Sequence, residues 1–163
     1  PSSLSWHLIG HLQSNKAVPA AELFDVIHSV DSAKLVGVLN RAAEAAGRTL
    51  NILLEVNVSG EASKFGLAPD AVAPVIEAAN AAPRLVLAGL MTMAPFSPDP
   101  EKARPFFRAL RELRERLARE SGTPLETLSM GMSGDFEVAI EEGATMIRIG
   151  TLLFGERRKA ETQ

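Results

Sequence analysis

Short apolar runs rich in β-branched residues alternate along the chain with longer segments in which apolar residues recur every three or four positions. The short runs predict β-strands, and the periodic segments predict helices. We expect strands at Trp6–Gly10, Val26–Val30, Asn51–Val58, Leu85–Met91, Thr127–Met132 and Met146–Gly150. Between these strands we expect helices at Asn15–Leu23, Ser32–Ala46, Pro69–Ala79, Glu101–Glu120 and Gly134–Glu142.

Single residues support these boundaries. Leu110, Leu113 and Leu117 form one apolar stripe along the fourth predicted helix. Gly47 follows the second predicted helix, where a left-handed residue commonly ends a helix. Asp31 and Ser32 are both candidate N-caps of that same helix.

The strict alternation of strands and helices predicts a parallel sheet with right-handed crossovers. Two architectures fit this pattern, an open doubly wound sheet and a (β/α)8 barrel. Six strands suffice for the first and are two fewer than the second requires. The pattern alone does not choose between them.

Composition indicates one globular domain. The chain has 163 residues, 46% apolar residues, a net charge of −3 and no cysteine, so nothing points to nucleic-acid binding, disulfides or thiolate metal sites. No apolar stretch approaches the roughly 20 residues of a membrane span, and the first residues carry no signal-peptide pattern. We therefore expect a cytoplasmic protein. The basic run from Arg111 to Arg119 alternates with glutamates and is interpreted as a solvated helix face.

Polar residues gather where the strands end, which is where α/β folds bind ligands. The last two predicted strands lead into the segments Ser129–Asp135 and Arg148–Thr151, which combine glycines with hydroxyl side chains. Ser133 and Gly134 precede a predicted helix, whose free N–H groups favour an anion such as phosphate. The alternative is that Ser133 only caps the helix that begins near Asp135, and one hydroxyl can serve both purposes.

Arg148 lies inside an apolar strand, where an unpaired guanidinium would be costly. It must meet an acceptor, either a ligand at the strand ends or a carboxylate such as Glu55 or Glu137. His7 is interpreted as a hydrogen-bonded core residue rather than a catalytic base. The three histidines, at positions 7, 11 and 28, lack the spacing of a metal site, and Glu55 and Asp135 are not recognisably paired for acid–base chemistry.

Several of these segments together resemble the pyridoxal-phosphate homeostasis protein family, and they occur in the family's order over nearly the whole chain. The matching segments are Trp6–Gly10 with Leu12–Lys16, Glu55–Ser59 with Ser63–Gly66, Gly89–Met93, Leu128–Ser133, and Ile147–Thr151 through Phe154–Gly155. The resemblance implies a (β/α)8 barrel like the N-terminal domain of alanine racemase. It also implies that pyridoxal 5′-phosphate (PLP) binds at the carboxyl-terminal mouth of the barrel.

The resemblance also implies roles for individual residues. Ser133, Gly150 and Thr151 would hold the phosphate, and Arg148 would face the pyridine nitrogen. Met132, Met91 and Ser129 would complete the cofactor-binding set, with Lys64, Asn57 and His7 as accessory residues.

One departure from the family is that its PLP-binding lysine, on the first barrel strand, has no counterpart here, nor does the Gly-Glu-Asn turn after the second strand. We therefore expect that residues 1–163 form a single barrel domain resembling strands 3 to 8, with the first two βα units absent and the imine-forming lysine upstream of Pro1. Lys64 and Lys16 carry amines on the mouth side, but an ordinary lysine is mostly protonated at neutral pH. Lys64 is expected to act electrostatically. The exposed strand edges could pair with another chain, whereas the full-length protein is expected to be a monomer or a weak dimer.

The resemblance favours a non-enzymatic protein that stores, delivers or buffers PLP, with PLP-dependent apo-enzymes as possible recipients. A racemase is one alternative, although it would need a second proton-transfer group, usually a tyrosine, and the chain has none. A barrel enzyme acting on a phosphorylated metabolite through Ser133 and Thr151 is the other.

Overall fold

The computed structural model describes residues 4–155 of the chain. Its six strands are β1 (His7–Leu8), β2 (Val26–Val30), β3 (Leu50–Glu55), β4 (Leu85–Met91), β5 (Thr127–Met132) and β6 (Met146–Arg148). Its α-helices are α1 (Ala17–Leu23), α2 (Ala33–Ala45), α3 (Val72–Asn80), α4 (Arg104–Ser121), α5 (Phe136–Glu141) and α6 (Thr151–Phe154). Three 3₁₀ turns, η1 (Ser14–Lys16), η2 (Pro69–Ala71) and η3 (Pro100–Ala103), lead into α1, α3 and α4.

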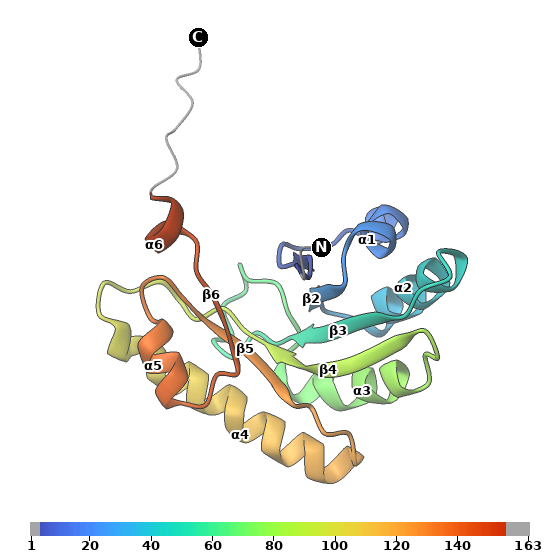
Figure 1. The fold of residues 1–163 in the computed structure, drawn as a ribbon. Coiled ribbons are helices and arrows are strands. Elements are labelled where there is room, and N and C mark those ends of the chain that lie inside the picture. The colour runs from blue at the N-terminus through green and yellow to red at the C-terminus, as the bar shows by residue number, and fades with distance from the viewer. Residues whose placement is uncertain (1–3, 156–163) are drawn as a thin grey trace.

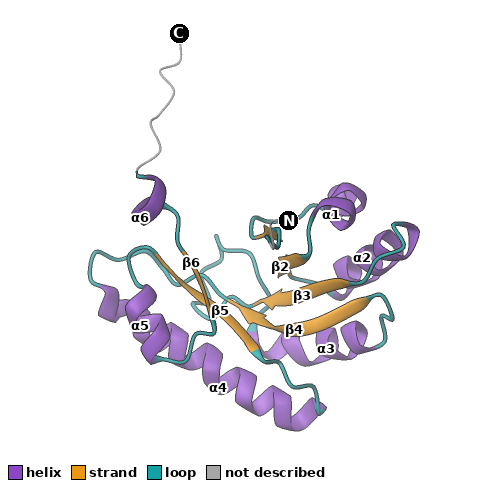
Figure 2. Cartoon of the chain, in the orientation of Figure 1, coloured by secondary structure: helices purple, strands orange, loops and turns teal. Residues whose placement is uncertain are grey.

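All strand pairs are parallel, and the strands follow one another in the sheet in chain order from β1 to β6. A doubly wound sheet would reverse its strand order at a switch point, whereas a barrel keeps sequential order. Helices α2 to α5 lie along one side of the strands (Figures 1 and 2). The fold is therefore a six-stranded parallel half-barrel, and the doubly wound alternative is excluded.

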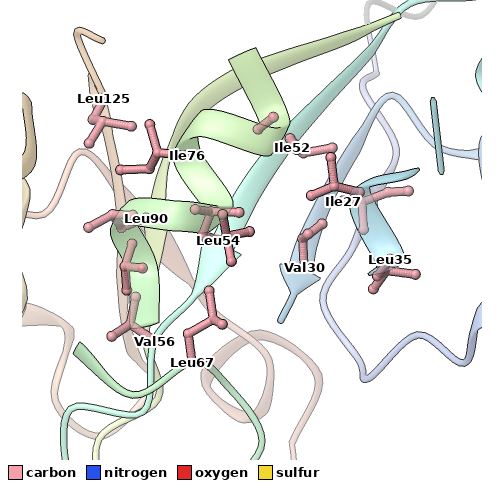
Figure 3. Close-up of a cluster of buried hydrophobic side chains, with 14 of the residues drawn as sticks. Ile27, Val30, Leu35, Ile52, Leu54, Val56, Leu67, Ile76, Leu90 and Leu125 are labelled. Carbon is pink, nitrogen blue, oxygen red and sulfur yellow. The ribbon is translucent and has the colours of Figure 1, made fainter. Parts of the chain in front are cut away.

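The hydrophobic core lies between the sheet and its covering helices. Alternate strand residues such as Ile27, Ile52, Leu54 and Leu90 form one buried cluster with Leu35 and Ile76 on the helices (Figure 3). Leu39 and Leu110 belong to the same cluster, and all of these residues are at most 2% exposed. Because side chains alternate along a strand, the residues between them face the inner side. The register aligns three such residues across neighbouring strands, Glu55 with Met91 and Met91 with Ser129.

Most predicted boundaries agree with the structure. The predictions for β2, β4 and β5 are confirmed residue for residue, whereas β1, β3 and β6 end earlier than predicted. Ser32 is the N-cap of α2 and its hydroxyl accepts from the Leu35 N–H, so the alternative cap, Asp31, is wrong. Gly47 has the left-handed φ of 63° predicted for it. The short helix α6, directly after β6, was not predicted.

The basic face of α4 differs from the prediction at its beginning. Arg104, Arg108 and Arg111 lie 3.2, 2.9 and 3.3 Å from the carboxylate of Glu142, which is only 4% exposed. A buried carboxylate needs such partners, so Arg111 joins α4 to the end of α5 instead of belonging to a solvated face. Within residues 4–155, no helix has both the length and the apolar character needed to cross a bilayer.

Candidate functional site

Arg148 is the last residue of β6 and is 8% exposed. Its Nη1 donates to Ser129 Oγ on β5 at 2.7 Å, and its Nη2 donates to the backbone oxygen of Thr92, just after β4, at 2.9 Å. The guanidinium therefore connects the carboxyl ends of three neighbouring strands. Its Nε is buried and has no hydrogen-bond partner among the described residues.

Within residues 4–155, no carboxylate forms an ion pair with Arg148, so the pairing with Glu55 or Glu137 that the sequence left open does not occur. Burial lowers the pKa of Arg148 from its ordinary value, while Asp135 and Glu55 act in the opposite direction from a distance. A guanidinium remains cationic under these conditions. The strand ends thus hold a buried positive charge whose Nε–H has no hydrogen-bond partner among the described residues.

Two histidines extend the contacts of Arg148 across the inner side of the sheet. His28 Nδ1 lies 3.0 Å from Ser129 Oγ, and His28 Nε2 lies 2.9 Å from His7 Nδ1. His7 Nε2 in turn lies 3.2 Å from the exposed Ser5 Oγ. Burial, with the charges of His7 and Arg148, lowers the pKa of His28 to about 4. His7 is hydrogen-bonded as predicted, but it is half-buried and does not belong to the core.

Glu55 ends β3 on the same inner side and is 4% exposed. Burial and the nearby charge of Asp31 raise the pKa of Glu55 to about 7, and Arg148 opposes that rise. Because the carboxyl group does not reach Arg148, it provides a proton-binding group beside the buried cation rather than a counter-ion to it.

A cavity of about 500 Å³ opens where β5 and β6 end. Its lining residues come from the loop after β4 and from the turns after β5 and β6, and they are Ala94, Phe96, Ser97, Met132, Ser133, Gly134, Asp135, Gly150, Thr151, Phe154 and Gly155. Figure 1 shows α6 beyond the carboxyl end of β6, away from the layer of helices α2 to α5. The turns after the last two strands therefore share one opening.

Ser133 joins these two turns directly. Its Oγ accepts from the N–H groups of Gly150 at 3.1 Å and Leu152 at 3.2 Å. The N-cap of α5 is Asp135, whose carboxylate accepts from the Met132 N–H at 2.7 Å. The alternative in which Ser133 caps the helix near Asp135 is therefore wrong. The hydroxyl instead gathers two backbone donors at the cavity wall, which is the arrangement an anion needs.

Comparison with known proteins shows the family to which the chain belongs. The family described as alanine racemase, N-terminal domain, matches residues 3–158. The pyridoxal phosphate homeostasis protein of Aquifex aeolicus is 48% identical over 155 residues, which cover 95% of this chain and 68% of that protein. The protein of the same name from Pseudomonas aeruginosa is 49% identical over 154 residues, covering 94% and 65%. The chain belongs to the pyridoxal phosphate homeostasis protein family.

A solved structure, of a protein described as a COG0325 family member, supports the fold. PipY of Synechococcus elongatus, in a structure with PLP bound, aligns with a TM-score of 0.87 at 38% identity, covering 94% of this chain and 72% of that one. The chain thus spans about two thirds of the length of the two homeostasis proteins that it matches.

The residues predicted from the family resemblance fall into three places. Met132, Ser133, Gly150 and Thr151 line the cavity. Arg148 and Ser129 are buried and bonded to each other, and they are not among the residues that line the cavity. Met91 is fully buried beside Ser129 in the register and does not line that cavity.

The accessory residues Lys64 and Asn57 lie in the loop after β3. The Asn57 amide is used within that loop, where it donates to the Glu61 carbonyl at 2.8 Å and accepts from the Gly60 N–H at 3.1 Å. Lys64 Nζ donates to the carbonyl of Met93, one residue before the cavity-lining Ala94. Lys64 is therefore close to the cavity rim, and Asn57 shapes the loop that carries it.

Sequence reasoning missed His28 as part of this site. A signal was present, because His28 is the one ionisable residue in the otherwise apolar, hydroxyl-containing strand Val26–Val30. A charged or polar group in a buried strand requires a partner, and here that partner is Ser129.

Proposed function

We propose that this chain is the PLP-binding part of a cytoplasmic PLP homeostasis protein that binds and releases the cofactor without turning over a substrate. The proposal is supported by two features at the carboxyl ends of β5 and β6. One is the set of backbone donors gathered by Ser133, and the other is the buried cation of Arg148 with its free Nε–H. PLP is an anion at one end and has a hydrogen-bond-accepting ring nitrogen at the other. PLP-dependent apo-enzymes are its proposed recipients.

The phosphate end of the proposed site consists of Ser133, Gly150 and Thr151 with the N–H of Leu152. The two N–H groups now satisfied by Ser133 Oγ would turn to phosphate oxygens, and the Ser133 hydroxyl would then donate to the phosphate instead of accepting. Such charge-assisted bonds are shorter and stronger than neutral ones. The side chain of Met132 would line the same cavity.

The ring end of the proposed site is Arg148. A buried N–H without a partner is uncommon in a folded protein, and the free Nε of Arg148 fits a ligand acceptor such as a pyridine nitrogen. PLP, when bound, supplies an electron-withdrawing ring. A permanently cationic donor beside the ring nitrogen keeps that nitrogen unprotonated and so weakens this withdrawal. That environment suits a carrier better than an amino-acid-transforming enzyme.

We further propose that the half-barrel is six of eight strands of a (β/α)8 barrel, equivalent to strands 3 to 8, and that residues 1–163 belong to that single domain. In the described residues β1 and β6 each have one strand neighbour, and unpaired strand edges are avoided in folded proteins. Exposed apolar residues stand near both edges, among them Trp6 and Ile147. Two further βα units would cover them, and the family's PLP-binding lysine would lie there. The complete protein would be a monomer or a weak dimer.

Replacing Ser133 with alanine in the full-length protein is expected to weaken PLP binding by about tenfold to a hundredfold, because a hydrogen bond to a charged group contributes roughly 1.5–3 kcal/mol. Titration followed by the near-visible absorption of bound PLP measures the effect. In the same variant, inorganic phosphate should no longer compete with PLP for the site.

Ser97→Ala is the matched control for this experiment. Ser97 lines the same cavity, but its hydroxyl accepts from the Asp99 N–H within its own loop. Its replacement should leave PLP affinity unchanged. Equal affinities of the Ser133→Ala protein and the wild type would refute the placement of the phosphate, and failure of the wild type to bind PLP at all would favour a phosphorylated metabolite as the ligand.

A further inference from the structure

A continuous line of hydrogen bonds runs from Arg148 to the protein surface through the side chains of Ser129, His28, His7 and Ser5. The four successive contacts measure 2.7, 3.0, 2.9 and 3.2 Å. Ser129 and His28 are at most 1% exposed, so water does not reach the middle of this line. Arg148, Ser129, His28 and His7 come from β6, β5, β2 and β1, four of the six strands, and Ser5 precedes β1.

The donor and acceptor roles along this line follow from its two buried members. Arg148 can only donate, so Ser129 Oγ accepts from it. The hydroxyl of Ser129 must place its own proton on an acceptor because it is fully buried. The acceptor within reach among the described residues is His28 Nδ1. His28 therefore carries its proton on Nε2.

The same reasoning fixes the next ring. His28 Nε2–H faces His7 Nδ1, so that atom accepts and His7 also carries its proton on Nε2, facing Ser5 Oγ. Each group donates to the next in the same direction, and such aligned bonds strengthen one another. The low pKa of His28, about 4, keeps its ring neutral at physiological pH, as this arrangement requires.

We propose that His28 is a positioning residue for the ligand of Arg148, holding the guanidinium through Ser129 so that Nε–H points at the ligand, and that His7 fixes the tautomer of His28. This inference rests on the proposed function, because the ligand concerned is PLP. It goes beyond the proposed function in assigning His28 and His7 a role that acts through Ser129 and Arg148.

The groups that orient Arg148 are uncharged, and this distinguishes them from the carboxylate of an ordinary ion pair. A carboxylate behind Arg148 would orient it equally well but would cancel its charge. Ser129, His28 and the Thr92 carbonyl orient the guanidinium with uncharged acceptors. Within the described residues, the full positive charge therefore remains available to an anionic ligand with an electron-rich ring nitrogen.

The tautomers can be read in the ligand-free protein. Nitrogen-15 NMR of histidine-labelled full-length protein distinguishes protonated from unprotonated ring nitrogens, and single histidine substitutions assign the signals. We expect His28 and His7 each to show a protonated Nε2 and an unprotonated Nδ1 at neutral pH. In the Ser129→Ala variant the preference of His28 should weaken, since its Nδ1 loses its donor. A protonated Nδ1 on His28 in the wild type would overturn the proposal.

Two substitutions at His28 separate positioning from packing. In His28→Asn, the side-chain oxygen occupies nearly the place of Nδ1 and still accepts from Ser129. His28→Leu offers a side chain of similar bulk with no acceptor. We expect His28→Leu to weaken PLP binding about tenfold, the effect of one misplaced charged hydrogen bond, and to shift the absorption band of bound PLP. His28→Asn should retain most of the affinity and the wild-type band.

The results of these measurements distinguish failure of the positioning role of His28 from failure of the proposed PLP binding. Equal affinities and spectra of His28→Leu and the wild type would overturn the positioning role. Equal losses in His28→Leu and His28→Asn would do the same, because they would indicate packing alone. If the wild type shows the expected tautomers but binds no PLP, the proposed function fails, and the positioning of a PLP ligand fails with it.

Discussion

Replacing Gly89 with alanine is expected to destabilise the protein by about 3 kcal/mol, at the upper end of what overpacking usually costs. A Cβ atom at Gly89 would lie 1.9 Å from the carbonyl oxygen of Thr127 and within 2.8 Å of its backbone nitrogen. Strand backbone cannot move aside as a flexible side chain can, so β5 must shift away from β4. Urea denaturation measures the loss in the free energy of unfolding.

The shift of β5 in Gly89→Ala would also displace residues of the proposed PLP site. Thr127 stands two residues before Ser129 on β5, and Ser129 holds both Arg148 and His28. We therefore expect the folded fraction of Gly89→Ala to bind PLP more weakly than the wild type. The close approach of β4 and β5 is what places the Thr92 carbonyl and the Ser129 hydroxyl on one guanidinium.

Gly37→Ala is the matched control. Gly37 lies within α2, and the nearest atom to an added Cβ is the end of the Arg41 side chain at 3.6 Å, an ordinary contact. Alanine in a helix interior is favoured over glycine by roughly 0.5–1 kcal/mol, so this variant should be slightly more stable than the wild type. If Gly89→Ala unfolded at the same urea concentration as the wild type, the described packing of β4 against β5 would be wrong.

The sheet was predictable where strands are buried on both sides. Leu85–Met91 reads as a near-continuous apolar run, and Val26–Val30 and Thr127–Met132 combine apolar residues with the buried Ser29 and Ser129. The runs at Trp6–Gly10 and Met146–Gly150 overestimated their strands. Each of these has only one strand neighbour in the described residues, and its hydrogen-bond ladder stops early.

The site was predictable in its chemistry and not in its connections. The glycines and hydroxyls after the last two strands predicted an anion site, and the structure brings those turns together through Ser133. The acceptor of the Arg148 guanidinium was expected to be a ligand or a carboxylate. The carboxylate alternative is wrong, because the Nη atoms donate to a serine 19 residues away and to a backbone carbonyl 56 residues away, and the ligand stays a proposal. Sequence patterns report the burial of a side chain but not which distant neighbours it meets.

The stability of the protein is expected to respond to pH through two buried groups that act in opposite directions. The pKa of Glu55 rises from 4.5 to about 7 on folding, so between these values the folded state holds a proton that the unfolded chain has lost. Stability from Glu55 is therefore present below pH 4.5 and is lost as the pH rises toward 7. The slope approaches about 1.4 kcal/mol per pH unit.

His28 has the reverse dependence. Its pKa falls from 6.5 to about 4 on folding, so between these values the unfolded chain binds a proton that the folded state does not. Stability from His28 is present above pH 6.5 and is lost as the pH falls toward 4, with the same limiting slope of about 1.4 kcal/mol per pH unit. In the range shared by the two groups, pH 4.5 to 6.5, their contributions nearly cancel in the wild type.

Single substitutions at Glu55 and at His28 should reveal how much each group changes the stability of the protein with pH. Relative to the wild type, Glu55→Gln should gain about 2–3 kcal/mol of stability as the pH rises from 4.5 to 7, because the variant has no carboxyl group to ionise. His28→Gln should gain a similar amount relative to the wild type as the pH falls from 6.5 to 4. Urea denaturation across this range measures both differences, and each variant is the control for the other. Every other ionisable group is common to the three proteins. If the stability of each variant changed with pH in parallel with that of the wild type, Glu55 and His28 would not be buried as described. The proposed orientation of Arg148 by uncharged groups would then also be wrong.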